Sequence, residues 1–405
     1  MKKIIKSYHR SKISFWNSIN TEWNAIKNDK AIIGVFLSIA LLILVAYTFV
    51  YSNQVVEKVP VGIVNQDASK LSRDYIAMLN SGDGLEANAI YSDLQEAKVA
   101  YYENEIKGVI IIPHDFEKNI KSGKQVTITT FSDASNMLFY KKILGTITTI
   151  NGYFNAGIII KKDISKGMSY KQAVENYTPI KSVSNSLFNI SGGYATYLIP
   201  MLTALIIQLV LLMGIGLING TRNEDRSMKS HFPRLEHKGG TIPVLLGKAV
   251  LYTFLYLIII PIQIGIIYTL FSIPIRSSLI TVYIFIIPYV FSVVFLGIVI
   301  SSFFKRREDS LLFIVLTSIP SLMLSGLSFP SEGFSKFYQI IAQLIPSTHG
   351  IEGFVKLTQM KASFIEISTE WYNLWGLTLL YFIMASFLLK LKVKKTDVKL
   401  INEVN

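Results

Sequence analysis

Long apolar blocks, separated by short charged segments, dominate this sequence. About twenty predominantly apolar residues form a helix long enough to cross the hydrocarbon core of a bilayer. The blocks predict six membrane-spanning helices, at residues 31–51, 194–218, 246–271, 279–304, 311–329 and 371–389. Because 51% of all residues are apolar and only 17% are charged, a wholly soluble chain is excluded.

Residues 52–193, between the first two spans, have a different character. Charges of both signs mix there with short apolar runs that turn residues bound, which is typical of strands; these runs are 61–64, 87–90, 109–112 and 126–130. Helical patterns alternate with them, and a long helix from about 136 to 165 follows. Such alternation predicts a small α/β domain. The chain has no cysteine, so this domain must be stable through its own core.

The basic residues predict the orientation in the membrane. Four segments are rich in lysine and arginine: 1–30, the loop after the second span, 305–307 and the tail 390–405. The positive-inside rule places all four in the cytoplasm, with both termini, and makes 52–193 extracytoplasmic. We therefore expect a multi-pass protein of a bacterial inner (plasma) membrane. Its fold class is an all-α membrane bundle of about six transmembrane helices plus a small extracytoplasmic α/β domain. This topology explains the net charge of +13 without a nucleic-acid partner.

Residues 1–30 have the pattern of an amphipathic helix. Phe15, Ile19 and Trp23 recur at helical spacing among charged residues. This pattern favours a helix that lies in the cytoplasmic membrane interface, which we term the elbow. An ordinary solvated leader is the alternative.

The loop 219–243 is the largest predicted cytoplasmic loop between spans and is dense in charge. We expect it to be the docking surface for a partner that supplies energy. The alternative is a basic loop that only fixes the topology. The charged residues that would pair with the partner are Arg222, Glu224, Asp225, Arg226 and Arg234.

After the fifth span, an apolar stretch near 334–346 is too short to cross the membrane. Pro330 and Pro346 bracket it, a pattern typical of a re-entrant or interfacial helix. A plain amphipathic surface helix is the alternative. Gly326, His349 and Glu352 flank the same segment.

Gln208 and Gln263 are the notable polar residues in the middle of spans. Polar side chains at such positions can line a transport path. The more ordinary interpretation is that they form hydrogen bonds between helices.

Catalytic and metal-binding motifs are absent from the sequence. Gly123-Lys124 and Gly247-Lys248 are the only Gly-Lys pairs, and neither is followed by the Ser or Thr of a phosphate-binding loop. The histidines form no H-E-x-x-H motif. We therefore expect no catalytic residues, no bound metal and no cofactor in this chain, and no enzymatic activity of its own. An ion-coupled carrier is disfavoured because the predicted spans hold almost no ionisable residues.

Three stretches carry a resemblance to a known family: Thr21–Phe36, Val59–Ile76 and Leu324–Gly353. With the order of the spans, they resemble the export-type (type-two) permeases of ATP-binding-cassette (ABC) transporters, in the subfamily with a large extracytoplasmic domain between spans one and two. One departure is Gly333-Phe334-Ser335, where the family often has proline or methionine.

The resemblance implies several partners. It implies two copies of an ABC ATPase subunit, which hold ATP and Mg, and a second permease subunit in a homodimer or heterodimer. It leaves open a periplasmic adaptor. It also implies that the elbow and the loop after span two receive the motor's movement, and that the substrate is an amphiphile such as a drug, a lipid or a glycan-like molecule.

The leading hypothesis is therefore the permease subunit of an ABC exporter, working by alternating access. The main alternative is a membrane-anchored extracytoplasmic binding or adhesion protein without transport activity.

Overall fold

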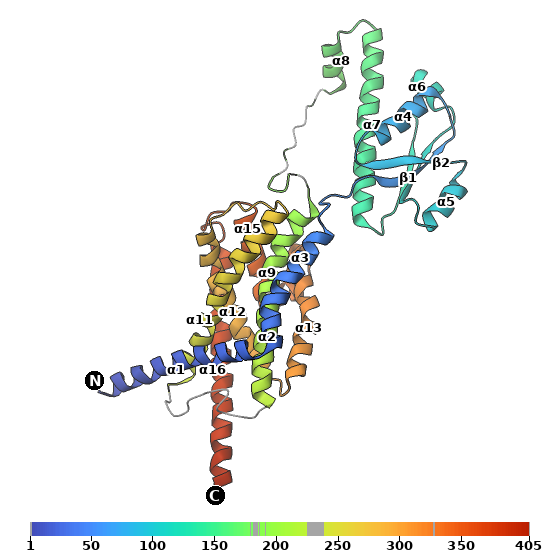
Figure 1. Ribbon diagram of the computed structural model, residues 1–405. Helices are drawn as coiled ribbons and strands as arrows, with labels where there is room; N and C mark the ends of the chain where they lie inside the picture. Colours follow the sequence, from blue (N-terminus) through green and yellow to red (C-terminus); the bar gives the residue numbers. More distant parts are fainter. Residues whose placement is uncertain are drawn as a thin grey trace. The chain divides into compact units, whose positions relative to one another are not determined.

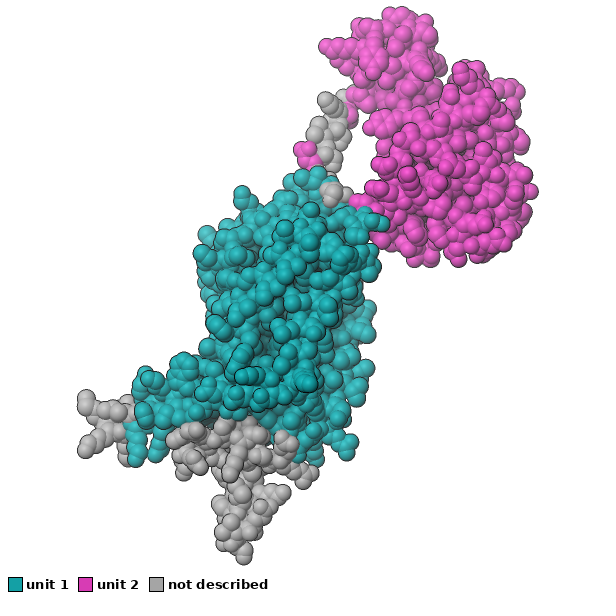
Figure 2. Space-filling view, in the orientation of Figure 1, with its two compact units in different colours: residues 1–54, 187–405 teal, residues 55–186 magenta. Residues whose placement is uncertain are grey.

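The computed structural model describes residues 2–178, 180, 185, 187–190, 192–224, 239–326 and 329–404. The chain divides into two compact units, shown in teal and magenta in Figure 2. Unit 1 comprises Met1–Gln54 and Leu187–Asn405, and unit 2 comprises Val55–Ser186.

Unit 1 is entirely helical in its described part (Figure 1). Its elements are α1 (Lys2–Asn28), α2 (Lys30–Ile33), the π-helical segment η1 (Gly34–Ile39), α3 (Ala40–Val50), α9 (Tyr194–Glu224), α11 (Thr241–Ile262), the π-helical segment η3 (Gln263–Tyr268), α12 (Leu279–Ser301), α13 (Arg307–Leu324), the 3₁₀ turn η4 (Ser331–Gly333), α14 (Lys336–Gln343), α15 (Pro346–Thr358) and α16 (Ser368–Val404).

Helix α9 lies at the centre of unit 1. Its most apolar window is 83% buried, whereas that of Lys30–Val50 is 33% buried. It packs against α3, α12, α13 and α15. The outer helices therefore expose apolar faces that only a lipid or another protein would cover.

In the described part of the chain, six helices are long and apolar enough to cross a membrane. They are Lys30–Val50, Met137–Ser165, Tyr194–Glu224, Thr241–Tyr268, Leu279–Ser301 and Ser368–Lys392. This set contains Met137–Ser165, which belongs to unit 2, and omits α13. Helix α13 begins with the charged residues Arg307, Glu308 and Asp309, so this 18-residue helix carries more charge than the apolar windows of the six helices above. It packs along α9 in unit 1, and the fifth span expected at residues 311–329 stays a prediction.

Unit 2 is a four-stranded sheet with helices on both faces. The strand order is β2-β1-β3-β4; β1 is parallel to β2 and β3, and β3 is antiparallel to β4. The strands are β1 (Val59–Asn65), β2 (Leu85–Tyr91), β3 (Gly108–Ile112) and β4 (Thr129–Ser132), and the helices are α4 (Lys70–Asn80), α5 (Leu94–Tyr102), α6 (Phe116–Lys121), α7 (Met137–Ser165) and α8 (Tyr170–Tyr177).

Two apolar cores hold unit 2 together. Helices α4, α6 and α7 cover one face of the sheet, where Ile63 of β1 and Ile147 of α7 are buried. Helix α5 covers the other face through Ala97 and Ala100. The predicted fold class, a helical membrane bundle with a small α/β domain, is confirmed. The fourth strand lies slightly later than the predicted 126–130.

Candidate functional site

Helix α1 runs across one end of the helical bundle (Figure 1). Its face against the bundle consists of Ser14, Ser18, Glu22 and Ile26, all buried and spaced by four residues, so that they lie in one row on the helix. The Ser18 hydroxyl donates to the carbonyl oxygen of Val244 in α11 over 2.8 Å. The small serines thus allow α1 to pack closely on α11. We term this the basic end, because Arg222, Lys248, Arg307 and Lys392 also lie there.

Glu22 is fully buried and joins three helices. Its Oε2 atom lies 2.7 Å from Nη1 of Arg222 in α9 and 3.1 Å from Nζ of Lys248 in α11. Its Oε1 atom accepts a hydrogen bond of 2.8 Å from the hydroxyl of Tyr252, also in α11. An isolated buried charge would cost several kcal/mol. This network, which we term the Glu22 cluster, therefore depends on all of its partners.

The two cations determine the charge of Glu22. Burial raises the pKa of this carboxyl, but Arg222 and Lys248 beside it lower the pKa more, to about 2. Glu22 is therefore ionised at neutral pH. One carboxylate then faces two cations, and the amide oxygen of Asn219 accepts from both, at 3.4 Å from Lys248 and 3.5 Å from Arg222.

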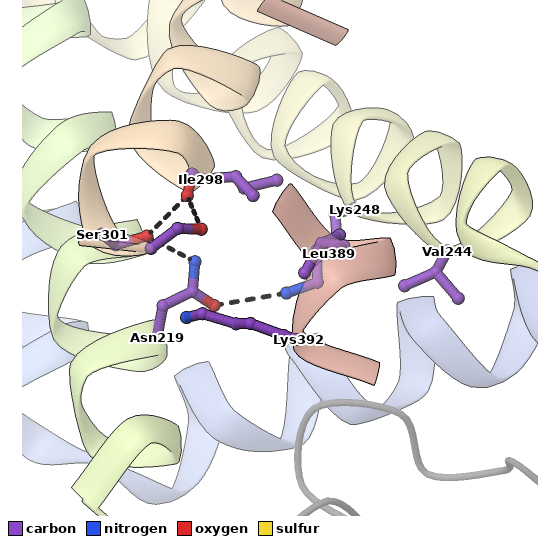
Figure 3. A pocket seen from close by; sticks show the side chains of 8 residues that line it. Asn219, Val244, Lys248, Ile298, Ser301, Leu389 and Lys392 are labelled. Carbon is purple, nitrogen blue, oxygen red and sulfur yellow. Dashed lines mark hydrogen bonds between the residues drawn. The ribbon is translucent and has the colours of Figure 1, made fainter. Parts of the chain in front are cut away.

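The cluster extends to two further helices. Figure 3 shows Asn219 with its amide nitrogen directed at Ser301, at the end of α12, over 2.9 Å. Lys392 of α16 donates to Oδ1 of Asn223 over 3.1 Å. A small pocket lies between these helices; its lining residues are Asn219, Val244, Lys248, Ile298, Ser301, Ser302, Leu389 and Lys392. Five helices of unit 1 therefore meet through polar contacts at the basic end.

A second junction joins the start of the first span to α13. The Arg307 guanidinium lies 2.6 Å from Oδ2 of Asp29, the residue that caps α2. The backbone N–H of Arg307 donates to Oε1 of Glu224 over 2.7 Å. The side chains of Arg307 and Asp29 are about three-quarters buried, with exposed fractions of 25% and 27%. The start of α13 is therefore held to both α2 and the end of α9.

The sequence-predicted docking and elbow residues occupy different places at this end. Arg222 is in the Glu22 cluster, and Glu224 is in the second junction. Asp225, Arg226 and Arg234 lie outside the described residues. Phe15 and Ile19 are half-buried, whereas Trp23 is 45% exposed. These three elbow residues flank the buried row of α1, and Ile19 packs against the helical core; their place in a membrane interface stays a prediction.

At the opposite end of unit 1, α14 and α15 form a helical hairpin. Gln208, near the middle of α9, accepts a hydrogen bond of 2.8 Å from the backbone N–H of Ser347. Pro346 occupies the first turn of α15, where a missing N–H costs nothing. The amino end of α15 therefore lies inside the bundle at the level of the middle of α9.

The remaining predicted residues of this region lie in the hairpin or shortly before it. His349 is buried, and its Nε2 atom lies 3.1 Å from the carbonyl oxygen of Gln343. Glu352 pairs with Lys356 over 2.8 Å. Gly326 follows α13 with a φ of +80°, which favours glycine. Pro330 precedes the turn η4.

The second mid-span glutamine also joins two helices. Gln263 donates to the carbonyl oxygen of Ala40 over 3.0 Å. It thereby connects η3 with the start of α3. Both glutamines thus form interhelical hydrogen bonds.

Sequence reasoning missed the most connected residues of the basic end. Glu22 stands among charged residues of the amphipathic α1, so nothing local distinguishes a buried carboxylate from a solvated one. Lys248 offered a signal, because it stands three residues into the predicted span 246–271. A cation at such a position needs a partner.

Comparison with known families gives one match. Residues 30–387 match a family described as ABC-2 family transporter protein. This range runs from the start of the first span through unit 2 to the last span. A comparison with curated proteins finds no match.

Proposed function

We propose that this chain, which belongs to the ABC-2 family of transporter proteins, is the permease subunit of an exporter that moves an amphiphilic substrate out of a bacterial cell. Membership makes it a multi-pass membrane component of an ABC transporter, associated with an ABC ATPase and generally not catalytic itself. The export direction, the substrate class and the assembly are our proposal. The assembly comprises two ATPase subunits, which hold ATP and Mg, and a second permease subunit.

The Glu22 cluster is the observation that carries this proposal. A motor that docks at the basic end can move the bundle only if the elbow transmits force to the spans. Glu22 of α1 contacts Arg222 of α9 and Lys248 of α11 directly. Removing one partner from such a buried ion pair costs about 3–5 kcal/mol. Helix α1 therefore moves together with α9 and α11 rather than sliding past them.

Alternating access follows from this rigidity. Packed helices shift between discrete arrangements rather than deforming continuously. ATP binding at the partner would displace α1, and the Glu22 cluster would carry α9 with it. Because Gln208 of α9 also accepts a hydrogen bond from the backbone of Ser347 in the first turn of α15, the displacement of α9 would reach the opposite end of the bundle. A path between two permease subunits would then open toward that end.

The orientation is proposed from charge. The basic end holds Arg222, Arg307 and Lys392, which belong to or border segments that the positive-inside rule assigns to the cytoplasm, and both termini would lie on that side. Since the chain has no cysteine, a single introduced cysteine reports its own location. We expect Lys124→Cys in unit 2 to react with an impermeant thiol reagent added to intact cells. Lys305→Cys should react only after lysis; the reverse pattern would overturn the orientation.

The motor is tested by purification in a mild detergent. We expect the full chain to retain a second protein that has a phosphate-binding loop and hydrolyses ATP. The Glu22→Gln variant should retain this partner but lose the effect of the permease on the hydrolysis rate. Glu117→Gln in unit 2, which removes a surface ion pair, is the matched control. Consistent absence of an ATPase would favour the membrane-anchored binding protein instead.

A further inference from the structure

Unit 2 contains a groove that the proposed transport mechanism does not use. It lies beside the second half of α7 and has a volume of about 420 Å³, within the range of small-molecule sites. Helix α7 forms one wall, and the segment between α6 and β4 forms the other. The lining residues are Tyr75, Phe116, Ile120, Gly123, Lys124, Gln125, Val126, Ile128, Asn151, Phe154, Asn155, Ile158, Ile159 and Lys162.

The apolar side chains that reach the groove surface are the half-buried Ile120, Val126, Ile128, Phe154 and Ile158 and the exposed Ile159. The rings of Tyr75 and Phe154 meet edge to face with centroids 5.1 Å apart, and Phe116 stacks on Phe154 at 6.1 Å. The hydroxyl of Tyr75 donates to Oδ1 of Asn151 over 2.6 Å. Tyr75 and Phe116 are themselves buried, so they support the half-buried Phe154 from within the domain rather than contact a ligand in the groove.

The rim of the groove is cationic. Its charged lining residues are Lys124 and Lys162, and no carboxylate lines it. The two lysines lie on opposite walls, and both are exposed. The Lys162 ammonium lies close to Gly123 on the facing wall, 3.5 Å from the position that a Cβ atom would take there. Lys162 therefore reaches across the rim, where it can meet an anionic group.

We propose that this groove binds a single acyl chain with an acidic head, that is, a long-chain carboxylate. The apolar interior would hold the chain, Lys124 and Lys162 would pair with the carboxylate, and Asn155 at the rim would add a hydrogen bond. Charge complementarity selects this occupant over a neutral one. Binding by unit 2 stands by itself; the further role, capture of an exported amphiphile by the permease, rests on the proposed function.

Photolabelling of the full chain tests the binding. The purified protein is irradiated with a palmitate analogue that carries a diazirine, and the labelled peptides are identified by mass spectrometry. We expect label on α7 between residues 154 and 162 and on the facing segment 123–128. Lys162→Glu should lower this labelling about fivefold, because an exposed ion pair contributes up to ~1 kcal/mol. Lys161→Glu, the same change on the neighbouring residue outside the groove, should leave it unchanged.

Two further comparisons make the outcome decisive. A neutral diazirine analogue of hexadecanol should label wild type weakly and should not respond to Lys162→Glu. Asn155→Trp, at an exposed rim position, should fill the groove and reduce labelling by palmitate. Absence of label on the groove residues of unit 2, or equal losses there with Lys161→Glu and Lys162→Glu, would overturn the proposal. Because photolabelling needs no ATPase, its outcome is independent of the co-purification experiment. Either proposal can therefore fail while the other holds.

Discussion

The two units of this protein hold themselves together in different ways. Unit 1 buries charges within its core: Glu22, Arg222 and Lys248 each expose less than a tenth of their surface. In the described part of unit 2, the ion pairs Lys118–Asp115, Lys121–Glu117 and Lys166–Asp163 have lysines that are 58–78% exposed. Of their carboxylates only Asp163 is buried, and Asn176 donates a hydrogen bond to it. Unit 2 relies instead on apolar packing around its sheet.

The burial of the ion pairs in unit 1 indicates that its helices are coupled and shift together. Surface ion pairs contribute little, so they do not fix one arrangement. Removing one partner of a buried ion pair destabilises the fold by several kcal/mol, so the helices that such a pair joins must move together. We therefore interpret unit 1 as the moving machinery and unit 2 as a stable domain that presents a groove.

The largest expected effect is that of Glu22→Gln. It leaves Arg222 and Lys248 buried without a carboxylate and should destabilise the protein by about 3–5 kcal/mol. Glu117→Gln, which breaks the pair with the 72%-exposed Lys121, should cost less than about 1 kcal/mol. Denaturant unfolding in detergent measures both.

A double variant sharpens this result. Glu22→Gln combined with Lys248→Met removes one carboxylate and one cation together, so it should recover part of the lost stability. The coupling energy between the two positions should then be about 0.5–3 kcal/mol. Strictly additive losses would show that the Glu22 cluster is not a cooperative unit.

The dependence of stability on pH follows from the same carboxylate. The pKa of Glu22 is lowered from 4.5 to about 2 in the folded protein, so its stabilisation is complete above the unfolded value. The stabilisation is lost as the pH falls from about 4.5 toward 2, because the unfolded chain takes up the proton first. In unfolding titrations, wild type should therefore approach the Glu22→Gln variant across this window. Parallel curves would contradict the pKa of Glu22.

Removing one buried tyrosine hydroxyl from each unit compares the stability that a single hydrogen bond contributes in each. Tyr252→Phe removes a hydrogen bond to the charged Glu22 and should cost about 1.5–3 kcal/mol. Tyr75→Phe in unit 2 removes a bond to the neutral Asn151 and should cost about 0.5–1.5 kcal/mol. Thermal unfolding of the two variants under the same conditions measures the difference. Equal losses would remove this distinction between the two cores.

Two helix glycines give effects of opposite sign. In unit 1, a Cβ atom at Gly353 of α15 would overlap the ring of Phe285, so Gly353→Ala should destabilise by about 1–3 kcal/mol. In α7 of unit 2, a Cβ at Gly145 meets nothing within 4 Å. Gly145→Ala should stabilise by about 0.5–1 kcal/mol, because alanine favours the helix. A stabilising Gly353→Ala would mean that α15 packs more loosely on α12 than described.

Much of the fold could be predicted from the sequence because its signals are local. Apolar length alone marks Tyr194–Glu224 as a membrane helix, and alternating short runs mark the sheet of unit 2. Composition was less able to separate α7 from α13. In α7 only 17% of the apolar window is buried, and Ile143, Ile147 and Ile150 are the buried apolar residues that cover the sheet. Helix α13 begins with three charged residues although it packs on α9.

The candidate site was harder to predict because its partners are far apart in the sequence. Glu22 and Lys248 are separated by more than two hundred residues, and the residue pattern of one helix does not indicate which residue of the other helix it contacts. The groove of unit 2 is lined by residues of α4, α6, the segment after α6 and α7, which are separated by long stretches of sequence. Gln208 was predicted as a polar residue within a span, but its hydrogen bond to the backbone of Ser347 depends on the path of the chain from α14 to α15.

The most direct test of the central claim is ATP-driven transport in inside-out vesicles that contain this chain and its co-purified ATPase. Uptake of fluorescent amphiphiles is measured with and without ATP, for wild type, Glu22→Gln and the conservative Glu22→Asp at equal amounts of folded complex. We predict ATP-dependent uptake by wild type, uptake at background level for Glu22→Gln despite continued ATP hydrolysis, and partial recovery for Glu22→Asp. Wild-type uptake by Glu22→Gln, or uptake by the chain without any ATPase, would contradict the account.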